Sequence, residues 1–332
     1  MQAPRLLITI DAEEDEWGKF DLPRYGVSNI GRIPLLQRLF EQNGFVPTYV
    51  ITAPVAEDPV AIEVLAPIVA RGACEIGVHC HPWNTPPFVE ERTPRNSMLC
   101  NLPSGLQVEK LGNLIGSISA NYGVTPRSFR AGRWGFSAEV GRNLTSVGII
   151  VDSSITPYVS WAAQHGPDFD RSYPETYRVS GEDLTVVDPA SDLVEVPVTI
   201  GFTGVLRAAG YPVHRALRTS PLRALRGRGI LNRVGLFRTS WLCPELAGSD
   251  DMIALTEAQV ARGASILNFM FHSGALLAGK TPYVRTPSDE VRFLRRIETY
   301  LRHCRARGFG SVTLSEIGAE ALGDGVFAPS LA

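Results

Sequence analysis

Cysteine is scarce in this sequence, and the few residues present are scattered. An odd set without a CxxC pair argues against a disulfide framework and is typical of a reducing compartment. Cys80 stands between two histidines, but on a strand its side chain would face away from both, so we expect a buried free thiol. The chain has five cysteines: Cys74, Cys80, Cys100, Cys243 and Cys304.

Long apolar runs are also missing. No stretch of 18 apolar residues occurs, which excludes a conventional transmembrane helix. Residues 1–5 lead directly into an apolar run that is too short for a signal peptide followed by a cleavage site. We therefore expect a protein without a membrane span that resides in the cytoplasm.

The sequence has almost no net charge and no low-complexity tract. Its 44% hydrophobic and 20% charged residues, spread over 332 positions, exclude a disordered or fibrous protein and indicate a globular chain with a large core. The net charge of −2 gives no reason to expect a nucleic-acid partner. One local basic stretch lacks the interleaved aromatic residues of base stacking, so we expect a solvated face there, with a site for an anionic sugar, phosphate or lipid headgroup as the alternative. The stretch comprises Arg215, Arg218, Arg223, Arg226, Arg228 and Arg233.

Strand-like and helix-like segments alternate along the chain. This alternation predicts parallel strands joined by crossover helices. The region from about 155 to 255 breaks the pattern and is rich in Pro, Gly and Arg, so we interpret it as insertions around one strand. Strands are expected near 5–11, 45–52, 73–80, 126–130, 147–152, 193–201, 266–272 and 311–314, and helices near 29–43, 59–71, 104–121, 136–146, 256–263 and 288–307.

Three of the predicted strands end in chemically reactive side chains. The apolar run 6–10 is followed by an acidic cluster at 11–15, the run 74–78 by His79 and His81, and the run 265–271 by His272. Buried strands do not end in packed carboxylates unless a cationic or catalytic group uses them. Carboxylates and imidazoles at the ends of successive strands are what an α/β barrel needs to assemble a metal and acid–base site on one rim.

The period of a strand predicts which of these side chains share a face. His79 and His81 do, so both could bind one metal ion. Glu13 lies on the same face as Asp11 if the strand geometry continues, and we therefore prefer Glu13 to Glu14 as a carboxylate ligand.

Five motifs in one order resemble the polysaccharide deacetylase (NodB homology) family, most closely its WalW-type branch. The resemblance spans nearly the whole chain and implies one deformed (β/α)7 barrel domain over residues 1–332, with insertions at about 155–255. It also implies a divalent metal ion, with zinc as the expected one, and removal of an N-acetyl group from a sugar. The motifs are IDAEED at 10–15, EIGVHCH at 75–81, FRAGRW at 129–134, VDSS at 151–154 and MFH at 270–272.

The resemblance also implies roles for single residues. Asp11 corresponds to the general base, Arg130 to the arginine that pairs with it, and His272 to the general acid. Trp134 corresponds to the aromatic wall against which a sugar ring stacks. Asp152 is expected to orient or charge-tune His272.

The chain departs from the family pattern at its second histidine. The family spaces its two histidines as HxxxH, whereas here Trp83 stands four positions after His79. The second ligand is therefore either His81 in a shifted geometry or absent. Glu195 interrupts an apolar run and is expected to point to the barrel mouth, with no role that we can assign. His165, His214 and His303 lack such context, and surface or capping roles are expected for them.

These observations leave three functions open. The first is a metal-dependent hydrolase that removes an N-acetyl group from a sugar or a sugar-containing precursor. The second is a metal-free hydrolase of C–N bonds in cyclic amides or ureides on the same barrel, which a missing second ligand would favour. The third is a non-catalytic carbohydrate-binding relative. We expect a carbohydrate or small-molecule substrate as the partner, and the sequence does not specify an oligomeric state.

Overall fold

Seven parallel strands form the centre of the fold in the computed structural model, which describes residues 3–205, 210–219 and 236–323. They follow one another in the order β10, β1, β2, β3, β4, β5 and β7, and the short β6 pairs antiparallel with β7 at the far edge. The strands are β1 (Arg5–Ala12), β2 (Thr48–Ile51), β3 (Glu75–Cys80), β4 (Ser128–Ala131), β5 (Val151–Asp152), β6 (Tyr177–Arg178), β7 (Val194–Glu195) and β10 (Ile266–His272).

The sheet curls but does not close by strand pairing between β7 and β10. Instead, irregular chain bridges this interval: Thr199 N donates to Asn268 O at 3.3 Å, and Met270 N donates to Leu242 O at 3.1 Å. A curled parallel sheet with helices around it confirms the predicted deformed (β/α)7 barrel, and the irregular interval is its deformation.

The strand predicted at 193–201 is in fact two strands. The chain leaves the main sheet after β7, and residues 200–203 form β8 (Ile200–Thr203), which pairs antiparallel with β9 (Arg238–Trp241) in a separate sheet. Pro197 lies between the two parts and has no N–H to donate to a ladder, so an unbroken strand is disfavoured there.

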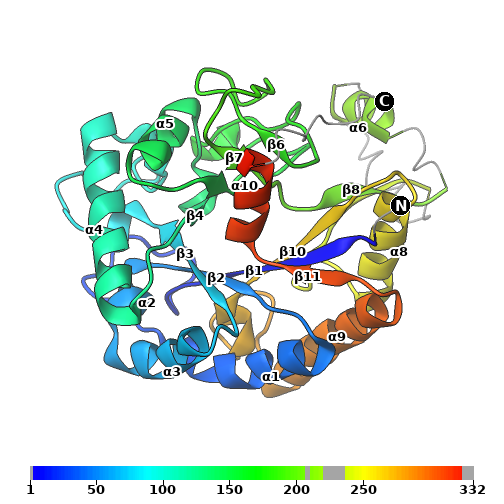
Figure 1. Cartoon of the computed structure of the whole chain (residues 1–332), viewed down its shortest axis with the longest axis horizontal. Coiled ribbons are helices and arrows are strands. Elements are labelled where there is room, and N and C mark those ends of the chain that lie inside the picture. The colour runs from blue at the N-terminus through cyan, green and yellow to red at the C-terminus, as the bar shows by residue number, and fades with distance from the viewer. Residues whose placement is uncertain (1–2, 206–209, 220–235, 324–332) are drawn as a thin grey trace.

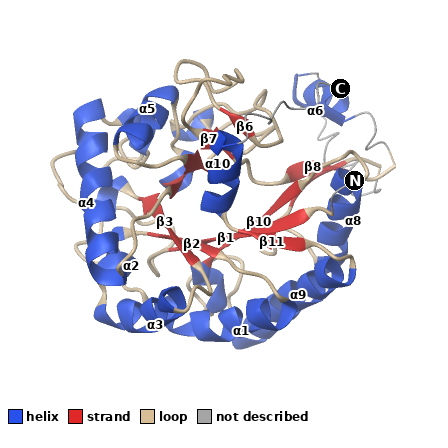
Figure 2. Ribbon diagram, viewed as in Figure 1, coloured by secondary structure: helices blue, strands red, loops and turns tan. Residues whose placement is uncertain are grey.

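Helices form the outer layer around the strands (Figure 2). The helix expected at 256–263 begins earlier, at Ser249, and ends at Val260, ahead of Gly263 with φ +94°. The helices are α1 (Ile33–Asn43), α2 (Ala53–Glu57), α3 (Pro59–Ala70), α4 (Ser104–Tyr122), α5 (Ala138–Ser146), α6 (Gly210–Thr219), α8 (Ser249–Val260), α9 (Pro287–Ala306) and α10 (Leu314–Gly323).

The last helix, α10, is drawn in red across the middle of Figure 1 and packs against the strands. Its buried face, with Leu314 and Ile317, joins Leu7, Val151 and Val194 in one apolar cluster. It follows β11 (Gly310–Val312), which pairs with residues 5–7 of β1, whereas β2 pairs with residues 9–12 of the same strand. The helix therefore covers the beginnings of the strands and leaves their carboxyl ends free for a site.

Cys80 is a buried free thiol, as expected. Cys80 is fully buried in the apolar core, and burial raises the pKa of its thiol to about 12, as predicted for an inert buried cysteine. Across the described ranges, none of the helices has both the length and the apolar composition needed to cross a bilayer. Arg223, Arg226, Arg228 and Arg233 of the basic stretch lie outside the described residues.

Candidate metal centre and catalytic residues

Parallel pairing brings the reactive strand ends together. Asp11 on β1 is in register with His272 on β10, and His79 on β3 is in register with Arg130 on β4. Because the carboxyl ends of parallel strands meet at one edge, side chains separated by up to 261 positions in the sequence become neighbours.

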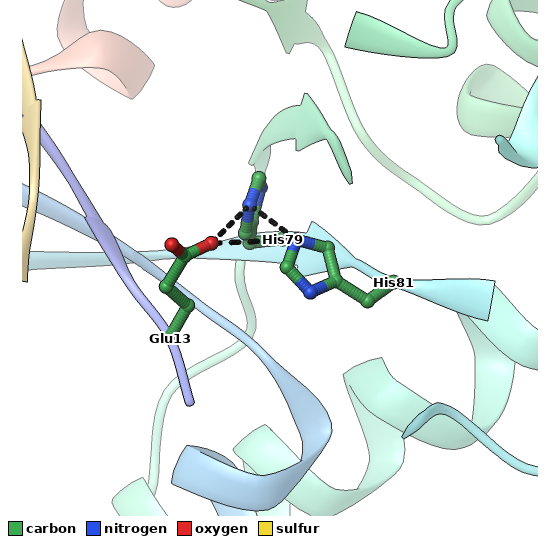
Figure 3. A group of neighbouring side chains, drawn as sticks. All are labelled: Glu13, His79 and His81. Atoms are coloured by element: carbon green, nitrogen blue, oxygen red, sulfur yellow. Dashed lines mark hydrogen bonds and ion pairs between the residues drawn. The ribbon is translucent and has the colours of Figure 1, made fainter. Parts of the chain in front are cut away.

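Glu13, His79 and His81 converge on one point (Figure 3). Glu13 Oε2 lies 3.6 Å from His79 Nε2 and 3.5 Å from His81 Nε2, and the two Nε2 atoms are 2.9 Å apart. Donors of a tetrahedral zinc shell lie about 3.3–3.5 Å apart, given zinc–ligand bonds of about 2.0–2.2 Å. The two distances to Glu13 are close to this spacing, and the two Nε2 atoms are nearer to each other at 2.9 Å. The three donors therefore have the chemistry of a divalent metal site and could share one ion, with at least one coordination position left over.

The outer nitrogens of both histidines are held by acceptors. His79 Nδ1 donates to the carbonyl oxygen of Arg130 at 2.9 Å, and His81 Nδ1 donates to Glu14 Oε1 at 2.8 Å. Protonation at Nδ1 leaves the lone pair of a neutral imidazole on Nε2, directed into the cluster, which is the usual support of a metal-binding histidine. Burial lowers the pKa of His81, but Glu14, Glu13 and Asp11 raise it above its ordinary value, so the field in the cluster favours a cation.

The structure separates the roles of Glu13 and Glu14. Glu13 belongs to the donor group, whereas Glu14 supports His81 from behind and also accepts from Trp83 Nε1 at 3.1 Å. The ring of Trp83 stacks on His81 with centroids 4.1 Å apart. The departure from HxxxH thus has a structural meaning: Trp83 fixes the orientation of the histidine two positions before it.

Gly132 permits the loop after β4 to approach this cluster. A Cβ atom at Gly132 would lie 2.2 Å from His81 Cδ2 and 2.8 Å from the carbonyl oxygen of Cys80. The next two residues, Arg133 and Trp134, have φ of +54° and +62°, a left-handed conformation that costs about 1–3 kcal/mol for each bulky residue. The loop is therefore strained where it borders the site.

Asp11 is buried and bound to Arg130. Arg130 Nη1 donates to Asp11 Oδ1 at 2.6 Å, and Thr9 and Ser153 fix the rest of the guanidinium. Burial raises the pKa of Asp11, but Arg130, His79 and His272 together hold it below its ordinary value. Asp11 is therefore an ionised carboxylate whose free oxygen, Oδ2, lies 3.6 Å from His272 Nε2.

His272 is held by a residue that the sequence did not reveal. Its Nδ1 donates to Glu245 Oε2 at 2.9 Å, and its backbone N–H donates to Glu245 Oε1 at 3.3 Å. Burial lowers the pKa of His272, but Glu245, Glu13 and Asp11 together outweigh burial and raise the pKa to about 10. Glu245 lies shortly after β9, a strand that the sequence pattern did not predict. Its acidic side chain after a strand is therefore the one signal that could have revealed it.

The expectation that Asp152 orients His272 is wrong. Asp152 accepts from Ser154 Oγ at 2.5 Å and is hydrogen-bonded to Glu195, its partner in register across β5 and β7. Side chains alternate along a strand, so Asp152 faces away from Ser153, the neighbour that contacts Arg130. Glu195 is fully buried in this pair and is not among the residues that line the cavity at the strand ends.

A cavity of about 670 Å³ lies beside the cluster and is lined by Asp11, Glu13, His79, His81 and His272. Trp134 is one of its walls, as expected, with its ring centroid 6.3 Å from that of Trp161 and 6.2 Å from that of Trp241. All five tryptophans of the chain line this cavity: Trp17, Trp83, Trp134, Trp161 and Trp241. Such a concentration of flat apolar rings suits the faces of sugar rings.

The remaining histidines lie away from the cavity. His165 is exposed, and His303, near the end of α9, contacts Glu257 at 3.0 Å. The expectation of a surface role for His214 is wrong, because it is buried with Nδ1 3.2 Å from Thr239 Oγ1 and Nε2 3.1 Å from Tyr158 O. His214 is buried because α6 packs against β9 and against the segment that contains Tyr158. Sequence periodicity cannot reveal this packing.

Sequence comparison and structure comparison give different results. No protein-family profile matches the sequence, and no curated protein matches it. Solved structures do match. A candidate polysaccharide deacetylase from Mycobacterium smegmatis has a TM-score of 0.56 at 14% identity, with 100% of this chain and 95% of that chain covered. A candidate glycoside hydrolase or deacetylase from Parabacteroides distasonis has a TM-score of 0.59 at 13% identity, with 96% and 71% covered.

The same fold also occurs in an enzyme of another type. The 4-alpha-glucanotransferase of Thermococcus litoralis has a TM-score of 0.55 at 12% identity, and the match covers 99% of this chain and 41% of that one. Identities this low establish a shared fold and no more. The comparisons therefore show that the chain has the deformed barrel of polysaccharide deacetylases.

Proposed function

We propose that this protein is a metal-dependent hydrolase that removes an N-acetyl group from a sugar or a sugar-containing precursor. The observation that carries the proposal is the Glu13, His79 and His81 donor group beside an ionised Asp11 and a carboxylate-held His272, all at one cavity. The five motifs further support membership of the WalW-type branch of the polysaccharide deacetylases. Cytoplasmic location stays a prediction.

The residues present divide the reaction between them. A divalent cation held by Glu13, His79 and His81, which we expect to be zinc, would polarise the acetyl carbonyl and stabilise negative charge on its oxygen. Asp11 Oδ2 accepts a proton from the attacking water, while Arg130 keeps that carboxylate ionised and oriented. His272 Nε2 donates a proton to the departing amine, and Glu245 holds the imidazolium.

The alternative of a metal-free C–N hydrolase loses its main support. That alternative was favoured by a missing second histidine ligand, whereas His81 supplies a second imidazole donor 2.9 Å from the first. A purely sugar-binding role gives no reason for an ionised carboxylate and a carboxylate-held histidine 3.6 Å apart beside the metal-donor group.

Metal analysis and acetate release test the proposal together. Protein stripped with a chelator and reloaded with zinc should bind about one equivalent and release acetate from N-acetylglucosamine oligosaccharides. His79→Ala should lose both properties and keep its melting temperature, because the ligand lies at the rim. The control is His165→Asn, which removes an exposed imidazole and tolerates the left-handed backbone there.

Asp11→Asn separates the metal site from the chemistry. This variant should still bind zinc and should lose about 10²- to 10⁴-fold in kcat/KM, the range of a positioned base. Full activity of metal-free protein would favour the C–N hydrolase alternative, and metal binding without acetate release from any N-acetylated sugar would contradict the deacetylase.

A further inference from the structure

Arg133 lines the cavity, and the chemistry described above leaves it without a role. Its side chain is half-buried and held on two sides. Arg133 Nη1 donates to Ser97 Oγ at 2.7 Å, and the guanidinium lies 5.9 Å from the centroid of the Phe20 ring. Ser97 is itself fixed, because its hydroxyl donates to the carbonyl oxygen of Pro94 at 2.6 Å. The guanidinium therefore has a defined plane and keeps further N–H donors for another partner.

The backbone conformation of residues 132–134 places Arg133 at the wall of the cavity. Arg133 has φ +54° and Trp134 has φ +62°, and Gly132 ahead of them packs against His81. Bulky residues rarely adopt this left-handed conformation, and where they do the strain often belongs to a binding site. The same strained turn thus places an aromatic wall and a guanidinium side by side, next to the proposed metal ligands.

Among the residues that the structure describes, no carboxylate lies within ion-pair distance of Arg133. Burial lowers its pKa, and no neighbouring acid counteracts that effect. By contrast, Arg130, three positions earlier on β4, is neutralised by Asp11 at 2.6 Å. A guanidinium that is partly removed from solvent and has no counter-ion is suited to bind an anion. Its planar array of N–H donors matches the oxygens of a carboxylate or phosphate.

We propose that Arg133 binds an anionic oxygen group, a carboxylate or a phosphate, on the acetylated sugar substrate. This inference rests on the proposed function for the identity of the sugar, and it adds the class of substrate: an acidic or phosphorylated N-acetylated sugar rather than a neutral one. In this arrangement Trp134 stacks on the face of the sugar ring, and Arg133 forms an ion pair with its charged substituent.

Binding of matched probes to zinc-loaded protein tests the proposal. The probes are N-acetylglucosamine 6-phosphate against N-acetylglucosamine, and a disaccharide of glucuronate and N-acetylglucosamine against N,N′-diacetylchitobiose. Titration calorimetry should show that one anionic probe binds more tightly than its neutral partner. Arg133→Gln should weaken that probe about 10- to 100-fold and change the neutral probes by less than about 2-fold. Whichever anion responds identifies the group as phosphate or carboxylate.

Arg92→Gln is the matched control. The Arg92 guanidinium also lies over a phenylalanine ring, at 5.7 Å from Phe88, but it is exposed and does not line the cavity, so its loss should change no dissociation constant. Arg133→Lys keeps the charge without the fork and should give a smaller loss than Arg133→Gln, which also covers the case in which Arg133→Gln folds poorly.

Two results would overturn the inference: anionic probes that bind no better than neutral ones, or an equal loss for all four probes in Arg133→Gln. Failure of the proposed function gives a different result. In that case the anionic probe still binds through Arg133, but no acetate is released from any probe.

Discussion

The reactive side chains of this site are each held by a second residue from a distant part of the chain. Arg130 fixes Asp11, Glu245 fixes His272, and Glu14 fixes His81. Such pairs set both the orientation and the charge of the reactive group. Replacing a supporting residue should therefore change a pH profile, whereas replacing the proposed base or acid should lower the rate by about 10²- to 10⁴-fold.

Glu245→Gln should shift the basic limb of the kcat/KM profile to lower pH. With His272 as the acid of the proposed reaction, activity is expected below its pKa and should be lost as the pH rises through it. Burial lowers that pKa and Glu245 is the main influence raising it, to about 10, so loss of the Glu245 charge lowers it. The rate should fall more at pH 9 than at pH 6.

The control for this prediction is Glu257→Gln. Glu257 forms another Glu–His contact, 3.0 Å from His303, on the outside of the molecule, so its replacement should leave the limb in place. An unchanged basic limb in Glu245→Gln would rule out His272 as the group that titrates there.

A buried lysine organises the segment that follows β3. Lys110 on α4 is fully buried, and its ammonium donates to the carbonyl oxygens of Pro82 at 2.9 Å, Thr85 at 2.7 Å and Pro87 at 2.7 Å. Glu90 completes the set at 2.9 Å. The loop that follows His81 includes Trp83. The ammonium of Lys110 thus ties this loop to helix α4.

Lys110→Met should destabilise the protein and weaken the metal site together. Loss of the ammonium leaves Glu90 and three carbonyl groups without their donor, and breaking a buried ion pair costs about 3–5 kcal/mol. Because the loop supports His81, zinc affinity should fall about 10- to 100-fold. Denaturant unfolding and zinc titration measure the two effects.

Lys19→Met removes an exposed lysine and serves as the control, with an expected change within about 0.5 kcal/mol. If Lys110→Met keeps wild-type stability and zinc affinity, the loop is positioned by something other than this ammonium.

For the molecule as a whole, the Asp152 and Glu195 pair links stability to pH. Burial and the neighbouring Asp152 raise the pKa of Glu195 well above 4.5, and Glu195 Oε2 meets no donor within the described parts of the chain, as expected of an oxygen that carries the proton. The folded protein therefore keeps a proton that the unfolded chain releases. The free energy of unfolding falls as pH rises from 4.5 toward the folded pKa, by about 1.4 kcal/mol per unit.

Glu195→Gln should remove this loss, because the amide can accept from Ile155 N and donate to Asp152 as the protonated acid does. We expect unfolding free energies close to the wild-type value at pH 5 and higher by at least about 1.4 kcal/mol at pH 8. Glu182→Gln, at an exposed carboxylate, is the control. A difference from wild type that does not grow with pH would show that Glu195 is ionised in the folded state.

The sequence by itself determined the parallel barrel and the residues at its strand ends. Apolar runs that end in Asp11, His79 and His272 carry this information locally, because each run is buried and each reactive residue follows it directly. The local period of the strand also predicted that Glu13, rather than Glu14, joins the two histidines. Zinc, the single domain with insertions and the catalytic roles stay predictions.

Only the tertiary structure decided which residues support the site. Glu245 reaches His272 from a chain segment with a weak pattern, Lys110 reaches the loop after β3 from a helix face, and Asp152 turns to Glu195 instead of His272. The five tryptophans are spread from 17 to 241 and meet only around the cavity. These contacts depend on how the helices and strands pack together. The Asp152 contact also depends on which side of the sheet a two-residue strand directs its side chains to. The local hydrophobic period of the sequence encodes neither property.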